Sequence, residues 1–173
     1  LTTGDRATAS LQYSYLGSVG AFLLDRDSPK EGSRVLFDVI HDYWSSLDPH
    51  HRPKLYVSGV SLGAYGGQSA FASAQDMARK VDGAVWAGTP GFTPRWNSRT
   101  PSRRAGSPEI APVIDNGETF RFATTPDELH HDHWGVDFPR WEGSRIAFLQ
   151  HASDPIVWWQ PQLITRDPYW IRE

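Results

Sequence analysis

Hydrophobic and polar positions follow a helical period between Ser33 and Leu47. The apolar residues recur every three or four positions and predict a single buried stripe, made of Val35, Leu36, Val39, Ile40, Tyr43, Trp44 and Leu47. Ser33 is placed to cap the start of this helix. The helix should end at Asp48-Pro49, because the residue before a proline avoids helical backbone angles. A second helix is predicted over 64–79.

Short apolar runs predict the strands, which are Thr8–Tyr15, Lys54–Ser58, Asp82–Ala87, Phe120–Thr124 and Arg145–Gln150. A tight turn over 59–63 separates the second strand from the second helix. Strands that alternate with helices predict an α/β fold, with a mostly parallel sheet flanked by helices. The carboxyl ends of such strands are where functional sites form.

The chain has 173 residues, which suggests a single domain over 1–173. A long loop at 88–118 interrupts the alternation and is rich in proline and arginine. This loop is too long for a routine connection, so it is either a surface excursion or a lid over a site.

Composition excludes several classes of function. The formal net charge is -3, and no basic patterning suggests nucleic acid. The chain has no cysteine, which excludes disulfides, a thiol nucleophile and cysteine-ligated metal. No apolar run approaches the ~18 residues that a membrane span requires, and no signal peptide is visible.

The most informative motif is G-x-S-x-G at Gly59–Gly63. At a sharp strand-to-helix turn, small residues on either side let the strand and helix pack closely and expose the serine hydroxyl. The motif follows an apolar strand and precedes a helix, as this reading requires. It predicts Ser61 as a nucleophile, with the backbone amide of Leu62 stabilising an oxyanion.

A carboxylate, Asp154, follows the strand predicted at 145–150. A catalytic triad needs such a group to orient a histidine and stabilise its cation, and in α/β-hydrolases the order along the chain is Ser, acid, His. Asp154 before a proline is otherwise an ordinary turn. No histidine follows it, because the seven histidines are 41, 50, 51, 130, 131, 133 and 151.

The remaining histidines suggest no metal site. His151 lies close to Asp154 in the sequence and could support the carboxylate without being the base. The segment His130–His133 holds three histidines and an aspartate, but metal sites prefer spaced ligands on a fixed scaffold, and this segment reads as a solvated loop. We expect neither a metal nor an organic cofactor.

The predicted fold is incomplete at both ends. Only one strand precedes the nucleophile strand, although the second oxyanion donor normally comes from a loop after an earlier strand. The base histidine is also missing. We therefore expect the chain to be the central part of a longer domain and, expressed alone, to be nearly inactive. An isolated piece that hydrolysed esters as fast as the complete domain would contradict this.

Several stretches resemble a family of actinobacterial membrane proteins with a C-terminal α/β-hydrolase domain. These stretches include ATASLQYSYL, RPKLYVSGVSLGAYGGQSAF, VDGAVWAGTP, GSPEIAPV, RFATTPDEL and LQHASDPIVWWQPQLITRDPYWIRE. The resemblance implies that Ser61 is the nucleophile, that Asp154 is the acid and that the base lies past residue 173. It also implies a membrane domain outside this chain, and hence a membrane-associated protein whose hydrolase domain is soluble.

These observations favour a serine esterase or lipase-like hydrolase acting on a small-molecule or lipid ester. Trp86, Trp96, Trp158 and Trp159 could line an acyl pocket, or could simply pack in the core and tail. Two alternatives remain open. One is a non-catalytic α/β-hydrolase-fold interaction module of a membrane protein. The other is an acyltransferase that uses the same triad.

Overall fold

A computed structural model describes residues 6–12, 20, 24–93, 103–108, 110–151, 153–158 and 165. The helices within this part are α2 (Asp27–Ser46), α3 (Leu62–Ser69), α4 (Ala74–Lys80) and α6 (Pro155–Trp158). The strands are β1 (Tyr56–Val60), β2 (Gly83–Ala87), β3 (Phe120–Ala123) and β4 (Arg145–Leu149). Two short 3-10 helices, η2 (Asp115–Gly117) and η3 (Asp127–Leu129), flank β3.

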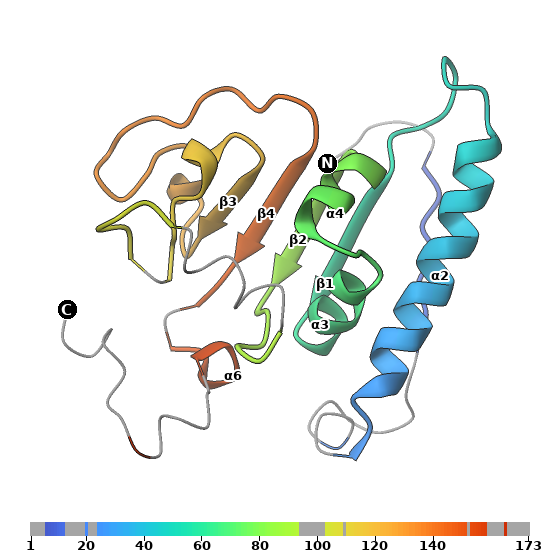
Figure 1. Ribbon diagram of the computed structural model, residues 1–173, viewed down its shortest axis with the longest axis horizontal. Coiled ribbons are helices and arrows are strands. Elements are labelled where there is room, and N and C mark those ends of the chain that lie inside the picture. Colours follow the sequence, from blue (N-terminus) through green and yellow to red (C-terminus); the bar gives the residue numbers. More distant parts are fainter. Residues whose placement is uncertain are drawn as a thin grey trace.

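The four strands form one parallel sheet in the order β1-β2-β4-β3 (Figure 1). The chain leaves β2, makes β3 at the far edge, and returns to place β4 between them. This arrangement confirms the predicted α/β fold with a parallel sheet and flanking helices. All four strands end at the same edge of the sheet, where α6 also lies in Figure 1.

The core lies between one face of the sheet and the helices. Trp86, Phe148 and Phe122 come from neighbouring strands in register and are all buried. The ring of Phe122 stacks on that of Phe148, with centroids 4.7 Å apart. Phe71, which follows α3, joins the same cluster. The other face is exposed at Tyr56, Val60 and Val85 within the described part of the chain.

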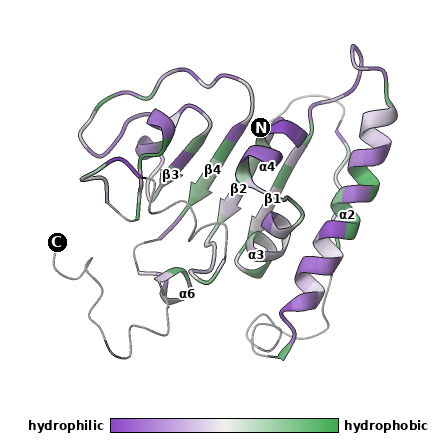
Figure 2. Cartoon of the chain, in the orientation of Figure 1, coloured by the Kyte–Doolittle hydropathy of each residue, from purple (hydrophilic) through white to green (hydrophobic). Residues whose placement is uncertain are grey.

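Helix α2 is longer than the sequence predicts and buries only part of its predicted stripe. It begins at Asp27 rather than near Ser33, and the Asp25 carboxylate accepts the backbone N–H of Ser28, in the first turn of the helix, at 3.1 Å. Hydrogen bonds from the Ser28 side chain and backbone lower the pKa of Asp25. Figure 2 shows apolar and polar residues mixed along this helix.

The predicted stripe divides in two. Its members Leu36, Ile40, Trp44 and Leu47 are half-buried, whereas Val35, Val39 and Tyr43 are exposed. The helix buries Pro29 and Phe37, and the Phe37 ring meets that of Phe71 edge-on, with centroids 4.5 Å apart. Helix α2 packs against α3 and not against the flat face of the sheet. A narrow apolar stripe on α2 is enough to cover the facing side of another helix.

The single helix predicted over 64–79 is two helices, α3 and α4. The Ser73 hydroxyl accepts the Asp76 backbone N–H at 2.9 Å, and the Asp76 carboxylate accepts the Ala72 N–H at 2.9 Å. These bonds cap the start of α4, so that α4 is a separate helix and not a continuation of α3. The strand predicted at 8–15 is also wrong over 8–12, which are exposed and pair with no strand; 13–15 lie outside the described residues.

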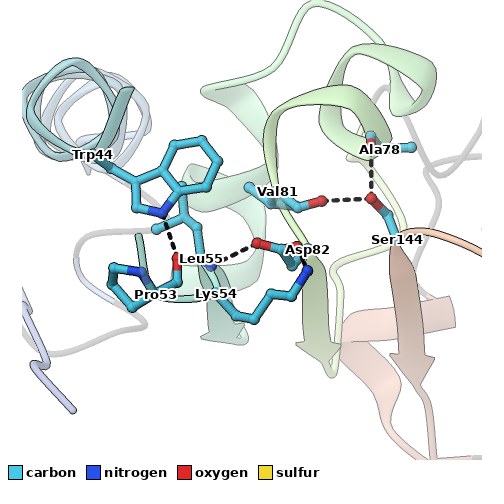
Figure 3. Close-up of polar contacts among 8 residues, drawn as sticks. All are labelled: Trp44, Pro53, Lys54, Leu55, Ala78, Val81, Asp82 and Ser144. Carbon is cyan, nitrogen blue, oxygen red and sulfur yellow. Dashed lines mark hydrogen bonds and ion pairs between the residues drawn. The ribbon is translucent and has the colours of Figure 1, made fainter. Parts of the chain in front are cut away.

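At the amino ends of the strands, polar contacts join β1, β2 and β4 to the helices (Figure 3). The Asp82 carboxylate accepts hydrogen bonds from the Lys54 ammonium at 2.7 Å and from the Leu55 N–H at 2.8 Å. The Ser144 hydroxyl donates to the carbonyls of Ala78 and Val81. These bonds lie at the edge of the sheet opposite to the one where α/β sites form.

Arg121 organises the long connection between β3 and β4. It is 3 % exposed, and its guanidinium donates to the backbone carbonyls of Gly117, Leu129 and Pro139. The guanidinium also lies 3.8 Å from the centroid of the Trp141 ring. Burial lowers the pKa of Arg121. One buried side chain therefore ties two points of this connection, Leu129 and Pro139, to the turn at Gly117 that precedes β3.

Replacing Arg121 with methionine is expected to lower the free energy of unfolding by about 2 kcal/mol, because three carbonyls lose a charged donor. Urea unfolding followed by circular dichroism measures the change. Arg121→Lys is the control and should recover only part of the loss, since an ammonium lacks the planar fork that reaches all three carbonyls. Unchanged stability in Arg121→Met would contradict the role given to this side chain.

Candidate active site

Ser61 stands between β1 and α3 in a strained backbone conformation. Its φ is 54° and its ψ is −118°, in a region that non-glycine residues seldom occupy. The neighbouring structure holds it there: the Ser61 N–H donates to the Ala87 carbonyl at 2.9 Å, and its carbonyl accepts the Tyr65 N–H at 3.0 Å. The Ser61 residue is half-buried. This is the sharp strand-to-helix turn that the motif predicts.

The two glycines of the motif differ in what they allow. A Cβ at Gly59 would lie within 3.0 Å of the Gly63 carbonyl and the Ala64 nitrogen, so a side chain there is sterically excluded. A Cβ at Gly63 would meet nothing within 4 Å. The close packing of β1 on α3 therefore requires a glycine at 59, whereas the expectation that it also requires one at 63 is wrong.

Asp154 lies in a turn just beyond β4. Its N–H donates to the His151 carbonyl at 3.0 Å, and the same carbonyl accepts the Trp158 indole N–H at 3.1 Å. The exposed His151 ring turns back on its own loop, where Nδ1 accepts the Ser153 N–H at 3.2 Å. The turn is thus held by its backbone together with the His151 and Trp158 side chains. The Asp154 side chain is half-buried.

The exit of β2 brings Ser61 and Asp154 to one place. Ala87, the last residue of β2, accepts the Ser61 N–H, and the next residue is Gly88. A Cβ on Gly88 would lie 3.4 Å from Oδ2 of Asp154. Gly88 has a φ of 55°, and its N–H donates to the Leu149 carbonyl at 2.8 Å. Of these two consecutive residues, Ala87 binds the backbone of Ser61 and Gly88 lies beside the Asp154 carboxylate.

The sequence analysis missed Gly88. A glycine that follows a buried strand is a common turn signal, and only the folded chain shows that this one has a positive φ and lies beside the Asp154 carboxylate. Leu62 begins α3, so its backbone N–H is among those that a helix cannot satisfy internally. Such a group, with the helix dipole behind it, suits a developing negative charge.

The histidines serve other contacts in the described structure. His41 stacks on Phe37 within α2, and His51 binds the Asp48 carboxylate at 2.7 Å. His131 Nδ1 lies 3.2 Å from the Asp132 carbonyl. No group of three histidine, aspartate or glutamate side chains that could hold a metal ion occurs within the described ranges.

The loop at 130–133 is more ordered than a solvated loop would be. The Asp132 carboxylate is buried and accepts the N–H groups of Trp134 and Val136, both at 2.9 Å. Arg104 donates to the same carboxylate at 3.3 Å and lies over the Trp134 ring. Asp132 therefore shapes a turn and anchors part of the segment at 88–118.

The tryptophans proposed for an acyl pocket divide between two roles. Trp86 is 1 % exposed and packs in the core, where its indole N–H contacts the Met77 sulfur at 3.4 Å, so the packing interpretation is confirmed for it. Trp158 binds the His151 carbonyl. Trp96 and Trp159 lie outside the described residues. In the long loop, Ala111, Val113 and Ile114 are buried, so that stretch is packed rather than projecting.

The sequence profile of the alpha/beta-hydrolase family matches residues 1–173. The chain therefore belongs to this family, whose fold agrees with the parallel sheet and the serine turn described above. Searches of curated proteins and of solved structures gave no match. Among the described residues, no helix is long and apolar enough to cross a membrane.

Proposed function

We propose that this protein is a serine esterase, lipase-like in mechanism, in which Ser61 is the nucleophile and Asp154 is the acid. The observation that carries the proposal is the convergence at the exit of β2. Ser61 binds Ala87 in a strained turn, and the Asp154 carboxylate lies against the neighbouring Gly88. Family membership supports a hydrolase in general.

The reaction runs in two halves. The Ser61 hydroxyl oxygen attacks the ester carbonyl carbon while a histidine takes its proton, and the resulting oxyanion accepts the Leu62 N–H. The intermediate collapses, and the histidine returns the proton to the departing alcohol. Water, deprotonated by the same histidine, then attacks the acyl-serine carbonyl. The histidine returns that proton to the Ser61 oxygen as the carboxylic acid leaves. Asp154 orients the histidine and stabilises its cation throughout.

The base in this proposal is a histidine that follows Asp154 in the full-length protein, beyond residue 173. The histidine nearest to Asp154 in the chain is His151, which faces the Ser153 backbone and belongs to the acid's own turn. A base from a later segment agrees with the chain order Ser, acid, His of this fold. We also propose that a further domain holds the protein at the cell membrane, with a small-molecule or lipid ester as substrate.

Fluorophosphonate labelling of the full-length protein tests the proposal. These probes react only with an activated serine hydroxyl, so the modified peptide is expected to contain Ser61. Ser61→Ala, with an unchanged melting curve, is expected to abolish the label. Absence of labelling in the folded wild-type protein would favour the non-catalytic interaction module. Labelling at Ser61 together with product transfer to a competing alcohol would favour the acyltransferase.

A further inference from the structure

Gln68 is a buried polar side chain near Ser61 that the proposed reaction does not use. It lies on α3, about two helical turns after Ser61, and is 1 % exposed. Its Nε2 donates to the Thr89 hydroxyl at 3.0 Å, and Thr89 is 0 % exposed. Its Oε1 is buried and has no hydrogen-bond partner among the described residues. This amide therefore makes one bond, across to the exit of β2.

Thr89 completes a run of three consecutive residues that contact the site. Ala87 accepts the Ser61 N–H, Gly88 lies against the Asp154 carboxylate, and Thr89 accepts the Gln68 amide. The nucleophile helix α3 thus meets the exit of β2 at two places, through Ser61 at its start and through Gln68 near its end. The second contact fixes the loop on which the carboxylate rests.

Packing alone does not account for a glutamine at this position. A buried acceptor without a partner costs roughly 1–3 kcal/mol. Replacement of both partners of a buried hydrogen bond by apolar groups of the same shape is often neutral or stabilising. An apolar pair would therefore fill the space at least as well, and a half-satisfied buried amide needs another explanation.

We propose that Gln68 is a positioning residue that, through Thr89, sets the distance between Ser61 and Asp154. The inference rests on the proposed esterase function. Gln68 touches neither the nucleophile nor the acid, so it acts on the reaction through the loop of residues 87–89. Displacement of a catalytic group by about 1 Å can cost roughly 100-fold in rate, so a smaller displacement is expected to cost about tenfold.

The test is the double variant Gln68→Met/Thr89→Val in the full-length protein, which removes both partners together with the unpaired oxygen. The melting temperature is expected to stay within about 3 °C of wild type, because no polar group is left without a partner. With p-nitrophenyl butyrate as the probe, kcat should fall about tenfold and KM should change less than about twofold.

The pH profile separates positioning from stability. A carboxylate held close to the base histidine raises the pKa of that histidine, so a displaced Asp154 lets it fall. The acid limb of the kcat/KM profile is therefore expected to move to lower pH, by about half a unit. Thr89→Ser keeps the hydroxyl and is expected to retain the wild-type limb. The near-isosteric Thr89→Val gives the same readout if the double variant does not fold.

Ser144→Ala is the matched control, because it removes partly buried hydrogen bonds at the opposite edge of the sheet (Figure 3). It should lower the melting temperature and leave the acid limb in place. A double variant with wild-type kcat and an unmoved limb would overturn the inference, as would a kcat loss that only follows a lowered melting temperature. Fluorophosphonate labelling of the wild-type protein is done before any substitution at Gln68. Absence of label at Ser61 would overturn the esterase proposal and this inference together.

Discussion

Asp154→Asn is expected to lower kcat for ester hydrolysis by the full-length protein by about 10⁴-fold. A carboxylate accepts the imidazole N–H and stabilises the imidazolium that forms when Ser61 loses its proton. An asparagine can present a donor instead, which favours the wrong tautomer of the base and leaves its cation without a countercharge. The turn that carries Asp154 is held by bonds to the His151 carbonyl and imidazole, which the substitution does not change, so the fold should stay intact.

The measurement is steady-state kinetics with p-nitrophenyl butyrate, alongside thermal melting by circular dichroism. Asp127→Asn is the matched control, because it makes the same chemical change at an exposed carboxylate on η3, on the connection that follows β3. It should leave kcat within about twofold of wild type, as surface substitutions generally do. A loss smaller than about tenfold in a folded Asp154→Asn protein would assign the acid role to another carboxylate.

Local patterns predicted much of this fold. Strand β2 is specified by a short apolar run. The turn at Ser61 is specified by Gly59, which lets β1 and α3 pack closely. The parallel sheet follows from the alternation of elements. What the sequence could not supply was the strand order, because the position of β3 at the far edge depends on contacts with β4 that lie far apart in the chain.

The errors have identifiable physical causes. The start of α2 was missed because the side chain that binds its first turn is Asp25, through the Ser28 N–H, and not Ser33. The predicted helix over 64–79 was divided by the reciprocal bonds of Ser73 and Asp76. In both places a short polar side chain bonds to the backbone and sets the helix boundary, an effect that hydrophobic periodicity does not register.

At the candidate site, the sequence predicts the residues proposed to carry the reactive groups but not those proposed to support them. Ser61 and Asp154 belong to recognisable patterns. Gly88 and Gln68 belong to none, since one is a glycine after a strand and the other a glutamine on a helix of small residues. Their roles depend on the distances to Asp154 and Thr89, which only the folded chain defines.

The second large effect is expected at Gly59. Gly59→Ala should lower the free energy of unfolding by about 3 kcal/mol, because the new Cβ would overlap backbone atoms of Gly63 and Ala64 that cannot rotate away. Relief of this overlap requires α3 to move away from β1. Ser61 lies between the two elements, so we expect the rate of ester hydrolysis to fall by about 100-fold as well.

Gly63→Ala provides the comparison, since both substitutions add one methyl group to the same motif. The new Cβ would meet nothing within 4 Å, and position 63 lies within α3, where alanine is favoured over glycine. The variant should therefore be more stable than wild type, by about 0.5–1 kcal/mol. Urea unfolding of both variants measures the difference. Equal effects at the two positions would mean that β1 and α3 do not cross as closely as the structure shows, and the strained conformation of Ser61 would lose its explanation.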